Sequence, residues 1–152
     1  MADQASEHTT IAASPALCWE VATDFEAYPE WAKDIKEAEV VHRDTDGRAS
    51  VVRFRAAAMG RSTTYLLGYD YSDAPNVLAW RLLEGDITKQ LDGSYAFRAI
   101  DGDESVTDVD YELTAELVVP LPGFVKRRAE GRIMQTALRD LKARVEAVAA
   151  SG

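Results

Sequence analysis

Cysteine and histidine are scarce in this chain of 152 residues, which contains only Cys18, His8 and His42. A single cysteine excludes an internal disulfide and is typical of a reducing compartment. The two histidines are far apart in sequence, and no metal-binding, phosphate-binding or nucleophile motif is present. We therefore expect no metal site and no cofactor, and we expect Cys18 to pack in a core rather than act as a nucleophile.

The chain also lacks long apolar runs and an excess of positive charge. No run approaches the roughly 18 apolar residues of a membrane span, and residues 1–7 have neither the basic nor the apolar part of a secretory signal. The net charge of −9 opposes nucleic acid as a partner. We expect a cytoplasmic protein that is not integral to a membrane. Without linker-like stretches, it should be a single domain over 1–152 with flexible tails at 1–6 and 149–152.

Local signals predict a strand, two short helices, six strands and a long helix. A first strand is expected over 7–13, and Ser14-Pro15 starts a short helix that a second helical turn follows. Five turn signals divide residues 35–119 into six strands, which short connections make antiparallel. Those signals are Asp46-Gly47, Gly60-Arg61, Ser72–Asn76, Glu84–Asp86 and Asp101–Asp103. After residue 123 the apolar period becomes 3.6 for about 25 residues, which indicates a helix.

Alternation within the predicted strands gives the sheet one apolar and one charged face. Arginines and the carboxylates Asp108, Asp110 and Glu112 fall on the charged face, where they are expected to pair across strands in water. The apolar face carries aromatic residues at Phe54, Trp80, Tyr95, Phe97 and Tyr111. The strand over 63–71 alternates ambiguously, and Tyr65 and Leu67 are assigned to the apolar face with that reservation.

One helix has to cover this whole apolar face, which predicts either an interior cavity or a filled aromatic core. Tyrosines favour the cavity, because buried phenol hydroxyls need partners that a solid apolar core does not supply. Few titratable side chains are expected to point inward. Since general acid–base catalysis normally needs such a group, the residues favour a non-catalytic ligand-binding protein over an enzyme.

Several sequence motifs resemble those of a known family. They are Ile11-Ala-Ala-Ser-Pro15, Trp19, Asp24-Phe25-x-x-Tyr28-Pro29-x-Trp31, Leu91-Asp-Gly93-Ser94-Tyr95-x-Phe97, Thr107-Asp-Val109-Asp-Tyr111-Glu-Leu113 and Pro120-Leu-Pro122-Gly123. The chain resembles polyketide cyclase/dehydrase and lipid-transport proteins, notably actinobacterial-type members. These belong to the helix-grip superfamily, together with START lipid-transfer domains and birch-pollen-allergen-like proteins. The resemblance covers nearly the whole chain.

The resemblance implies an α+β helix-grip fold, in which a seven-stranded curved antiparallel sheet surrounds a long C-terminal helix. It also implies an apolar cavity between sheet and helix, with an entrance near the short helices and the 120–123 loop. Trp31 would lie at that entrance. The candidate ligand-binding residues are Trp31, Phe54, Tyr65, Trp80, Tyr95, Phe97 and Tyr111, with Met134 and Leu138 on the helix side.

Three functions remain open at this point. The first is binding or transport of a hydrophobic small molecule, such as a lipid, quinone or polyketide. The second is a polyketide aromatase/cyclase or dehydratase in which a tyrosine or a water moves the proton. The third is a protein-interaction module that docks through the basic cluster Lys126–Arg128 or through the charged face of the sheet.

Overall fold

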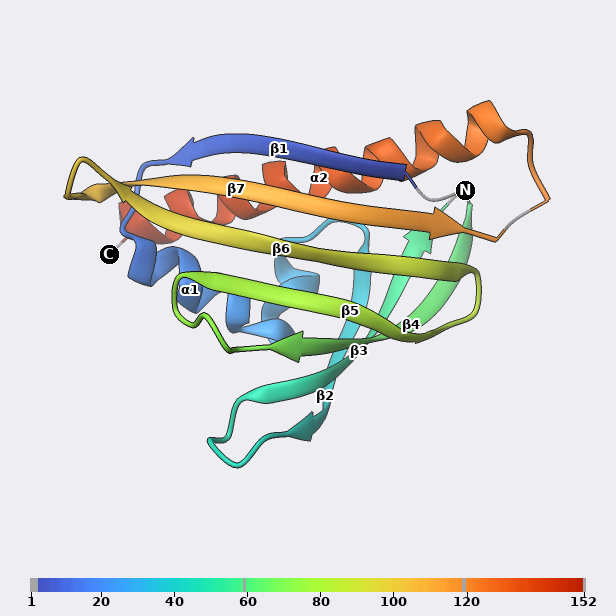
Figure 1. Ribbon diagram of the computed structural model, residues 1–152, viewed down its shortest axis with the longest axis horizontal. Coiled ribbons are helices and arrows are strands. Elements are labelled where there is room, and N and C mark those ends of the chain that lie inside the picture. The colour runs from blue at the N-terminus through green and yellow to red at the C-terminus, as the bar shows by residue number, and fades with distance from the viewer. Residues whose placement is uncertain (1–2, 59, 119, 152) are drawn as a thin grey trace.

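The computed structural model describes residues 3–58, 60–118 and 120–151. Figure 1 labels the helices and strands, apart from the 3-10 helix η1. In chain order these elements are β1 (Asp3–Ile11), α1 (Pro15–Thr23), η1 (Phe25–Glu30), β2 (Ile35–Arg43), β3 (Ala49–Ala58), β4 (Arg61–Asp70), β5 (Val77–Gly85), β6 (Thr88–Ile100), β7 (Asp103–Leu117) and α2 (Gly123–Ser151). Seven antiparallel strands, two short helices after the first strand and one long final helix confirm the predicted α+β helix-grip architecture.

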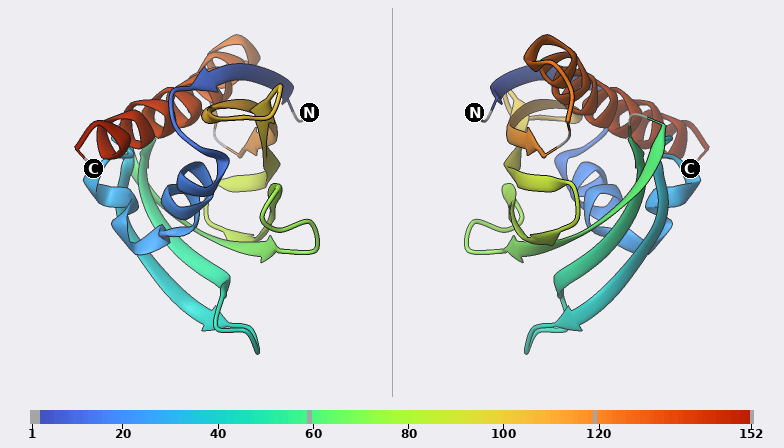
Figure 2. Two further views of the ribbon diagram at one scale, coloured as in Figure 1. Left: turned by 90° about the vertical axis from the view of Figure 1, so that its left-hand side faces the viewer. Right: turned by 90° about the vertical axis from the view of Figure 1, so that its right-hand side faces the viewer.

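The strands form one sheet in the order β1-β7-β6-β5-β4-β3-β2. Every neighbouring pair is antiparallel, as the short turns require. Figure 2 shows the sheet curling from β1, beside α2, down to the β2–β3 hairpin. Helix α2 packs against β1, β7 and α1, so the curved sheet and this helix enclose the interior between them.

Strand and helix extend further towards both ends of the chain than the sequence predicts. Strand β1 begins at Asp3, which pairs with Ala115 of β7, so residues 3–6 belong to the sheet and not to a loose tail. Helix α2 continues to Ser151, into the segment 149–152 that the sequence predicts to be a tail. The polar residues of 3–6 looked tail-like, but an edge strand needs only backbone pairing and has one solvated face. Residues 1, 2 and 152 lie outside the described residues.

The short helices form where their capping residues predict. The Ser14 hydroxyl accepts a hydrogen bond from the Leu17 backbone N–H at 3.1 Å, and Pro15 occupies the first turn of α1. Helix η1 contains Pro29 and ends at Glu30. Helix α1 lies towards one end of the long strands (Figure 1), and η1 packs against β2. Of the helices in the described chain, none is both long and apolar enough to cross a membrane.

The outer face of the sheet carries the ion pairs that the alternation predicts. The Arg53 guanidinium lies 2.6 Å from Glu39 on the neighbouring strand, and Arg98 lies 2.7 Å from Asp110. Arg55 pairs with Glu37 in the same way. Each of these pairs is solvent-exposed, so water and salt screen the attraction and it adds little to stability. The outer face therefore provides solubility and strand register more than stability.

Candidate ligand-binding cavity

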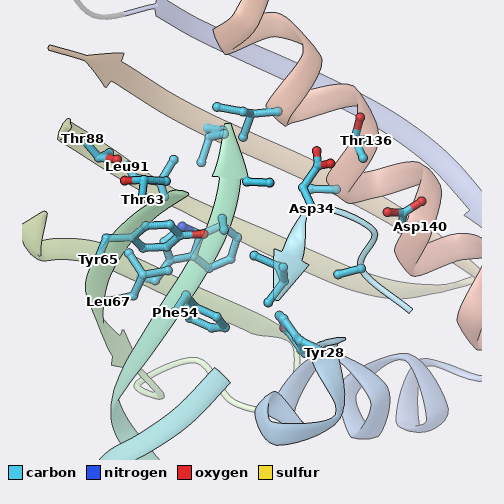
Figure 3. A pocket seen from close by; sticks show the side chains of 18 of the residues that line it. Tyr28, Asp34, Phe54, Thr63, Tyr65, Leu67, Thr88, Leu91, Thr136 and Asp140 are labelled. Atoms are coloured by element: carbon cyan, nitrogen blue, oxygen red, sulfur yellow. The ribbon is translucent and has the colours of Figure 1, made fainter. Parts of the chain in front are cut away.

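An interior cavity of about 160 Å³, the inner cavity, lies between the curved sheet and α2 (Figure 3). Strands β3 to β7 form its wall, while η1, the segment before β2 and α2 close it. The lining residues are Tyr28, Trp31, Ala32, Asp34, Ile35, Phe54, Ala56, Ala57, Thr63, Tyr65, Leu67, Tyr69, Trp80, Thr88, Leu91, Tyr95, Tyr111, Leu113, Leu117, Ile133, Thr136, Ala137 and Asp140. The interior is therefore not a completely filled aromatic core.

Aromatic side chains of neighbouring strands form the wall of the inner cavity. Side chains alternate between the two faces of a strand, so these residues lie on the same face of the sheet. The strand register then places them directly opposite one another on neighbouring strands. Tyr95 is the direct partner of Tyr111, and their rings stack with centroids 4.8 Å apart. Phe54 is the direct partner of Tyr65, and their rings are tilted with centroids 5.7 Å apart. Such cross-strand aromatic pairs stabilise the sheet and give the cavity a continuous π-surface.

The indole of Trp80 reaches this wall because its neighbour on β6 is a glycine. A Cβ atom built on Gly93 would lie 2.8 Å from the Trp80 ring and 2.5 Å from the Glu112 carbonyl oxygen. No other residue fits there without displacing the indole. Its ring centroid lies 5.2 Å from that of Tyr95. Gly93 thus allows Trp80 to lie close against the sheet and leaves the space above it free.

Four tyrosine hydroxyls on the wall are available to a ligand. The Tyr28 hydroxyl donates to the Ala22 carbonyl, but those of Tyr65, Tyr69, Tyr95 and Tyr111 form no hydrogen bond with other described residues. Within the described chain, no fully buried side-chain oxygen or nitrogen lacks a partner. These four hydroxyls therefore keep accessible surface, and the surface they share is the cavity that they line. Each can donate or accept one hydrogen bond there.

Burial keeps these hydroxyls protonated. Burial, and secondly the charge of Asp34, raise the pKa of Tyr65 above its usual value. Burial and then the charge of Asp140 raise the pKa of Tyr95 in the same sense. Burial also raises the pKa of Tyr69 and Tyr111. At neutral pH the wall therefore presents neutral phenols and no phenolates.

Two carboxylates line the inner cavity, contrary to the expectation of few inward-facing titratable groups. Figure 3 shows Asp34, Thr136 and Asp140 together on the α2 side of the pocket. The buried Asp140 carboxylate accepts a hydrogen bond from the Lys33 backbone N–H at 3.0 Å. Asp34 is fixed through its backbone carbonyl, which accepts from Ala57 N–H at 2.8 Å. This gives the cavity an aromatic side and an acidic side.

Helical spacing is the signal that identifies Asp140 in the sequence. It follows Ile133 by seven positions and Ala137 by three, which places it on the same helix face. The same helix face contains Met134, Leu138 and Leu141. When this face is assigned as apolar from these residues, the single carboxylate of Asp140 on it is overlooked. Asp34 has no such signal, because it precedes β2 in an irregular segment.

Six of the nine predicted site residues line the inner cavity, namely Trp31, Phe54, Tyr65, Trp80, Tyr95 and Tyr111. The other three, Phe97, Met134 and Leu138, are buried in the core and are not among its lining residues. The helix side is formed instead by Ile133, Thr136, Ala137 and Asp140. Which apolar residues of α2 line the cavity depends on the angle and position at which α2 crosses the sheet. The sequence does not specify that crossing. That any of these residues contacts a ligand stays a prediction.

A second and wider space, the outer groove, adjoins the inner cavity. It measures about 550 Å³ and includes Arg128 and Arg132 on α2. The two spaces share Asp34, Ala57, Leu117 and Ile133 among their lining residues. The opening of the cavity is thus between α2 and the segment of Asp34. Residues 120–123, which the resemblance placed near the entrance, are not among the groove's lining residues.

The remaining candidate groups lie away from the cavity. Cys18 is buried in the core, as predicted, and His8 pairs with Asp108 on the outer face. Of the described residues, no three His, Cys, Asp or Glu side chains are grouped so as to hold a metal ion. In the basic cluster Lys126–Arg128, Arg127 and Arg128 are exposed at the start of α2.

Solved structures of several proteins share this fold. A START superfamily protein from Mycobacterium smegmatis matches with a TM-score of 0.86 at 26% identity, over 95% of this chain and 98% of that one. A protein from Thermus thermophilus matches with a TM-score of 0.79 at 27% identity, over 99% and 100%. The Zhui aromatase/cyclase of a Streptomyces species has a TM-score of 0.78 at 20% identity, over 95% and 92%. At that identity the likeness concerns the fold alone.

No curated protein sequence matches the chain significantly. A family model does match, and its description is polyketide cyclase/dehydrase and lipid transport. The match runs over residues 3–146, from the first strand into the last turns of α2. It therefore includes every residue that lines the inner cavity. By this match and its fold, the chain belongs to the polyketide cyclase/dehydrase and lipid transport family.

Proposed function

We propose that this protein binds a hydrophobic small molecule in the inner cavity and carries it without changing it chemically. The observation that supports this most is the aromatic wall with four hydroxyls that have no hydrogen-bond partner among the described residues. A mostly apolar pocket with a few polar groups is the common form of a small-molecule site. The apolar wall supplies affinity, and the hydroxyls orient the ligand.

The size of the cavity favours a ring compound over a long acyl chain. A dry cavity of about 150 Å³ is known to hold benzene, and the inner cavity measures about 160 Å³. Stacking on Tyr95, Tyr111 and Trp80 adds to the affinity of a flat ring. Quinones and polyketide-derived aromatics combine such rings with oxygen atoms that the hydroxyls can bind. A long acyl chain would have to extend into the outer groove.

Binding is tested with protein freed of copurified ligands by unfolding and refolding. Isothermal titration with a panel of quinones, aromatic polyketides and lipids should give saturable binding for ring compounds, with one site per chain. Ala137→Phe, which places a ring in the cavity, should abolish that binding. Ala143→Phe on the exposed side of α2 is the matched control. Absence of saturable binding across the panel would refute the proposal.

A second candidate is a polyketide cyclase or dehydratase, and the cavity carboxylates favour it. Asp34 and Asp140 line the same space as the tyrosines, and a carboxylate is an effective general base for removing a proton beside a carbonyl group. Incubation with a poly-β-keto substrate separates this candidate from the carrier. A changed product profile that disappears in Asp34→Asn supports catalysis, whereas identical products with and without protein support the carrier.

A further inference from the structure

We propose that the inner cavity selects ring compounds that carry a hydrogen-bond donor and no negative charge. This inference rests on the proposed function, because it assigns the chemical class of the ligand in the same cavity. It comes from the distribution of charge between the inner cavity and the outer groove.

The charged side chains that line the inner cavity are all acidic. Asp34 and Asp140 are the carboxylates, and its lining residues include no lysine, arginine or histidine among those that the structure describes. An anionic group on a ligand would find no counter-ion there and would lose its hydration. It would also be repelled by both carboxylates across a space of low polarity, where such repulsion is stronger than in water.

The field of these carboxylates reaches the aromatic wall. The charge of Asp34 contributes to the raised pKa of Tyr65, and the charge of Asp140 contributes to that of Tyr95, in both cases after burial. A raised pKa means that the site disfavours a negative charge on the phenol oxygen. A carboxylate or phenolate group of a ligand beside these hydroxyls would be disfavoured for the same reason, because it also places a negative charge there.

The polar groups of the cavity favour a donor on the ligand. An ionised carboxylate only accepts hydrogen bonds, so Asp34 needs a donor from water or from a ligand. No hydrogen bond from another described residue to the Asp34 side chain is present, whereas Asp140 already accepts from Lys33. A phenolic or enolic O–H on the ligand would satisfy Asp34 and leave the tyrosine hydroxyls to bind its other oxygens.

The cations nearest the opening belong to the outer groove. Arg128 and Arg132 are one helical turn apart on α2, and neither forms an ion pair with another described residue. An acidic substituent on a larger ligand would therefore remain in the outer groove beside these arginines. Asp34 lies at the boundary and lines both spaces, so the two arginines are what distinguish the outer groove, which can hold an anion that the inner cavity opposes.

Three probes of the same ring size test the proposal, namely naphthalene, 2-naphthol and 2-naphthoate. At pH 7 the naphthol is neutral and the naphthoate is ionised, because a phenol is a much weaker acid than a carboxylic acid. Isothermal titration of the full chain should give at least about tenfold tighter binding of 2-naphthol than of 2-naphthoate. Desolvation alone also disfavours the anion, so the same ratio is measured in Asp34→Asn. There it should fall by about threefold but stay above one, because one of the two repelling charges is gone while the charge of Asp140 and the desolvation cost remain.

Asp73→Asn is the matched control, since it removes an equal charge from an exposed turn distant from the cavity. It should leave the ratio unchanged. Equal binding of naphthol and naphthoate to the wild-type protein would overturn the inference while leaving the proposed function intact. A ratio that is the same in wild type and Asp34→Asn would also overturn it. Failure of all three probes to bind would refute the inference and the proposed ring-binding function together.

Discussion

The interior of the sheet has a filled half and a hollow half, and strand β7 contributes to both, with Val109 in the filled half and Tyr111 in the hollow half. Near the buried face of α1 and the C-terminal half of α2, Ile11, Val109, Leu141 and Val145 are fully buried, and none of them lines the inner cavity or the outer groove. Towards β3, β4 and β5, the aromatic residues line the inner cavity instead. The filled half consists mostly of aliphatic side chains, and the hollow half of large rings with hydroxyls. Aliphatic side chains interdigitate, whereas rings that stack across strands form a wall and leave the space above it open.

The filled half should contribute most of the free energy of unfolding. Leu141→Ala removes a fully buried side chain from close packing and should lower the free energy of unfolding by about 2–5 kcal/mol. Ile133→Ala, at the cavity wall on the same helix, should lower it by about half as much or less, because its neighbours already border free space. Urea denaturation measures both. Equal losses would show that the two halves do not differ in packing.

Filling the hollow half should remove binding without a comparable loss of stability. Ala137→Phe should weaken the binding of 2-naphthol by at least about tenfold, because the new ring occupies free volume that the ligand needs. The free energy of unfolding should change by no more than about 1 kcal/mol, since no packed side chain is displaced. Titration calorimetry and urea denaturation give the two values. Unchanged affinity would place the ligand outside the inner cavity.

The rim of the hollow half depends on polar contacts. Burial acts to raise the pKa of Asp86, but hydrogen bonds from Thr63, Thr64 and Ile87 outweigh it, and the pKa lies below its usual value. A lowered pKa in the folded state stabilises the fold above the unfolded-state pKa, and this stability is lost as the pH falls through the folded-state value.

Asp86→Asn should therefore cost about 1 kcal/mol at pH 7, which corresponds to a melting temperature lower by about 2–4 °C. The difference from wild type should shrink below about pH 4, where the wild-type carboxyl also becomes protonated. Thermal melting between pH 3 and pH 7 measures it. In Asp73→Asn, whose carboxylate accepts no such hydrogen bonds from the described residues, the melting temperature should stay unchanged. If the difference in melting temperature between wild type and Asp86→Asn did not change with pH, the charge of Asp86 would not be what stabilises the rim.

The filled half should also protect Cys18 from chemical modification. Burial raises the pKa of its thiol, so a thiol reagent should modify it at least about 100-fold more slowly in the folded protein than in urea. In a Cys18→Ala background, Ala137→Cys should react faster than Cys18, because the hollow half opens to the outer groove. Absorbance of the released thiol follows both rates. Rapid modification of Cys18 would contradict close packing around α1.

The sequence predicts which face of the sheet is apolar, but not where that face is hollow. Period two alone assigned Phe54, Trp80 and Tyr95 to the interior, because side-chain direction in a strand is a local property. The free volume depends on the line along which α2 crosses the sheet, and that line is set by long-range packing. This is why Met134 and Leu138 fall in the core. Asp34 could not be predicted, because an irregular segment has no period from which to assign a direction.

The central claim is that a ring compound binds in the hollow half and nowhere else. It is tested most directly by titrating 2-naphthol into protein with labelled methyl groups and recording two-dimensional NMR spectra. We expect saturable shifts for Ala56, Leu91 and Ala137 around the inner cavity, and unchanged signals for Ile11, Val109 and Val145 in the filled half. Shifts that do not saturate, or that appear only on residues of the outer face, would contradict it.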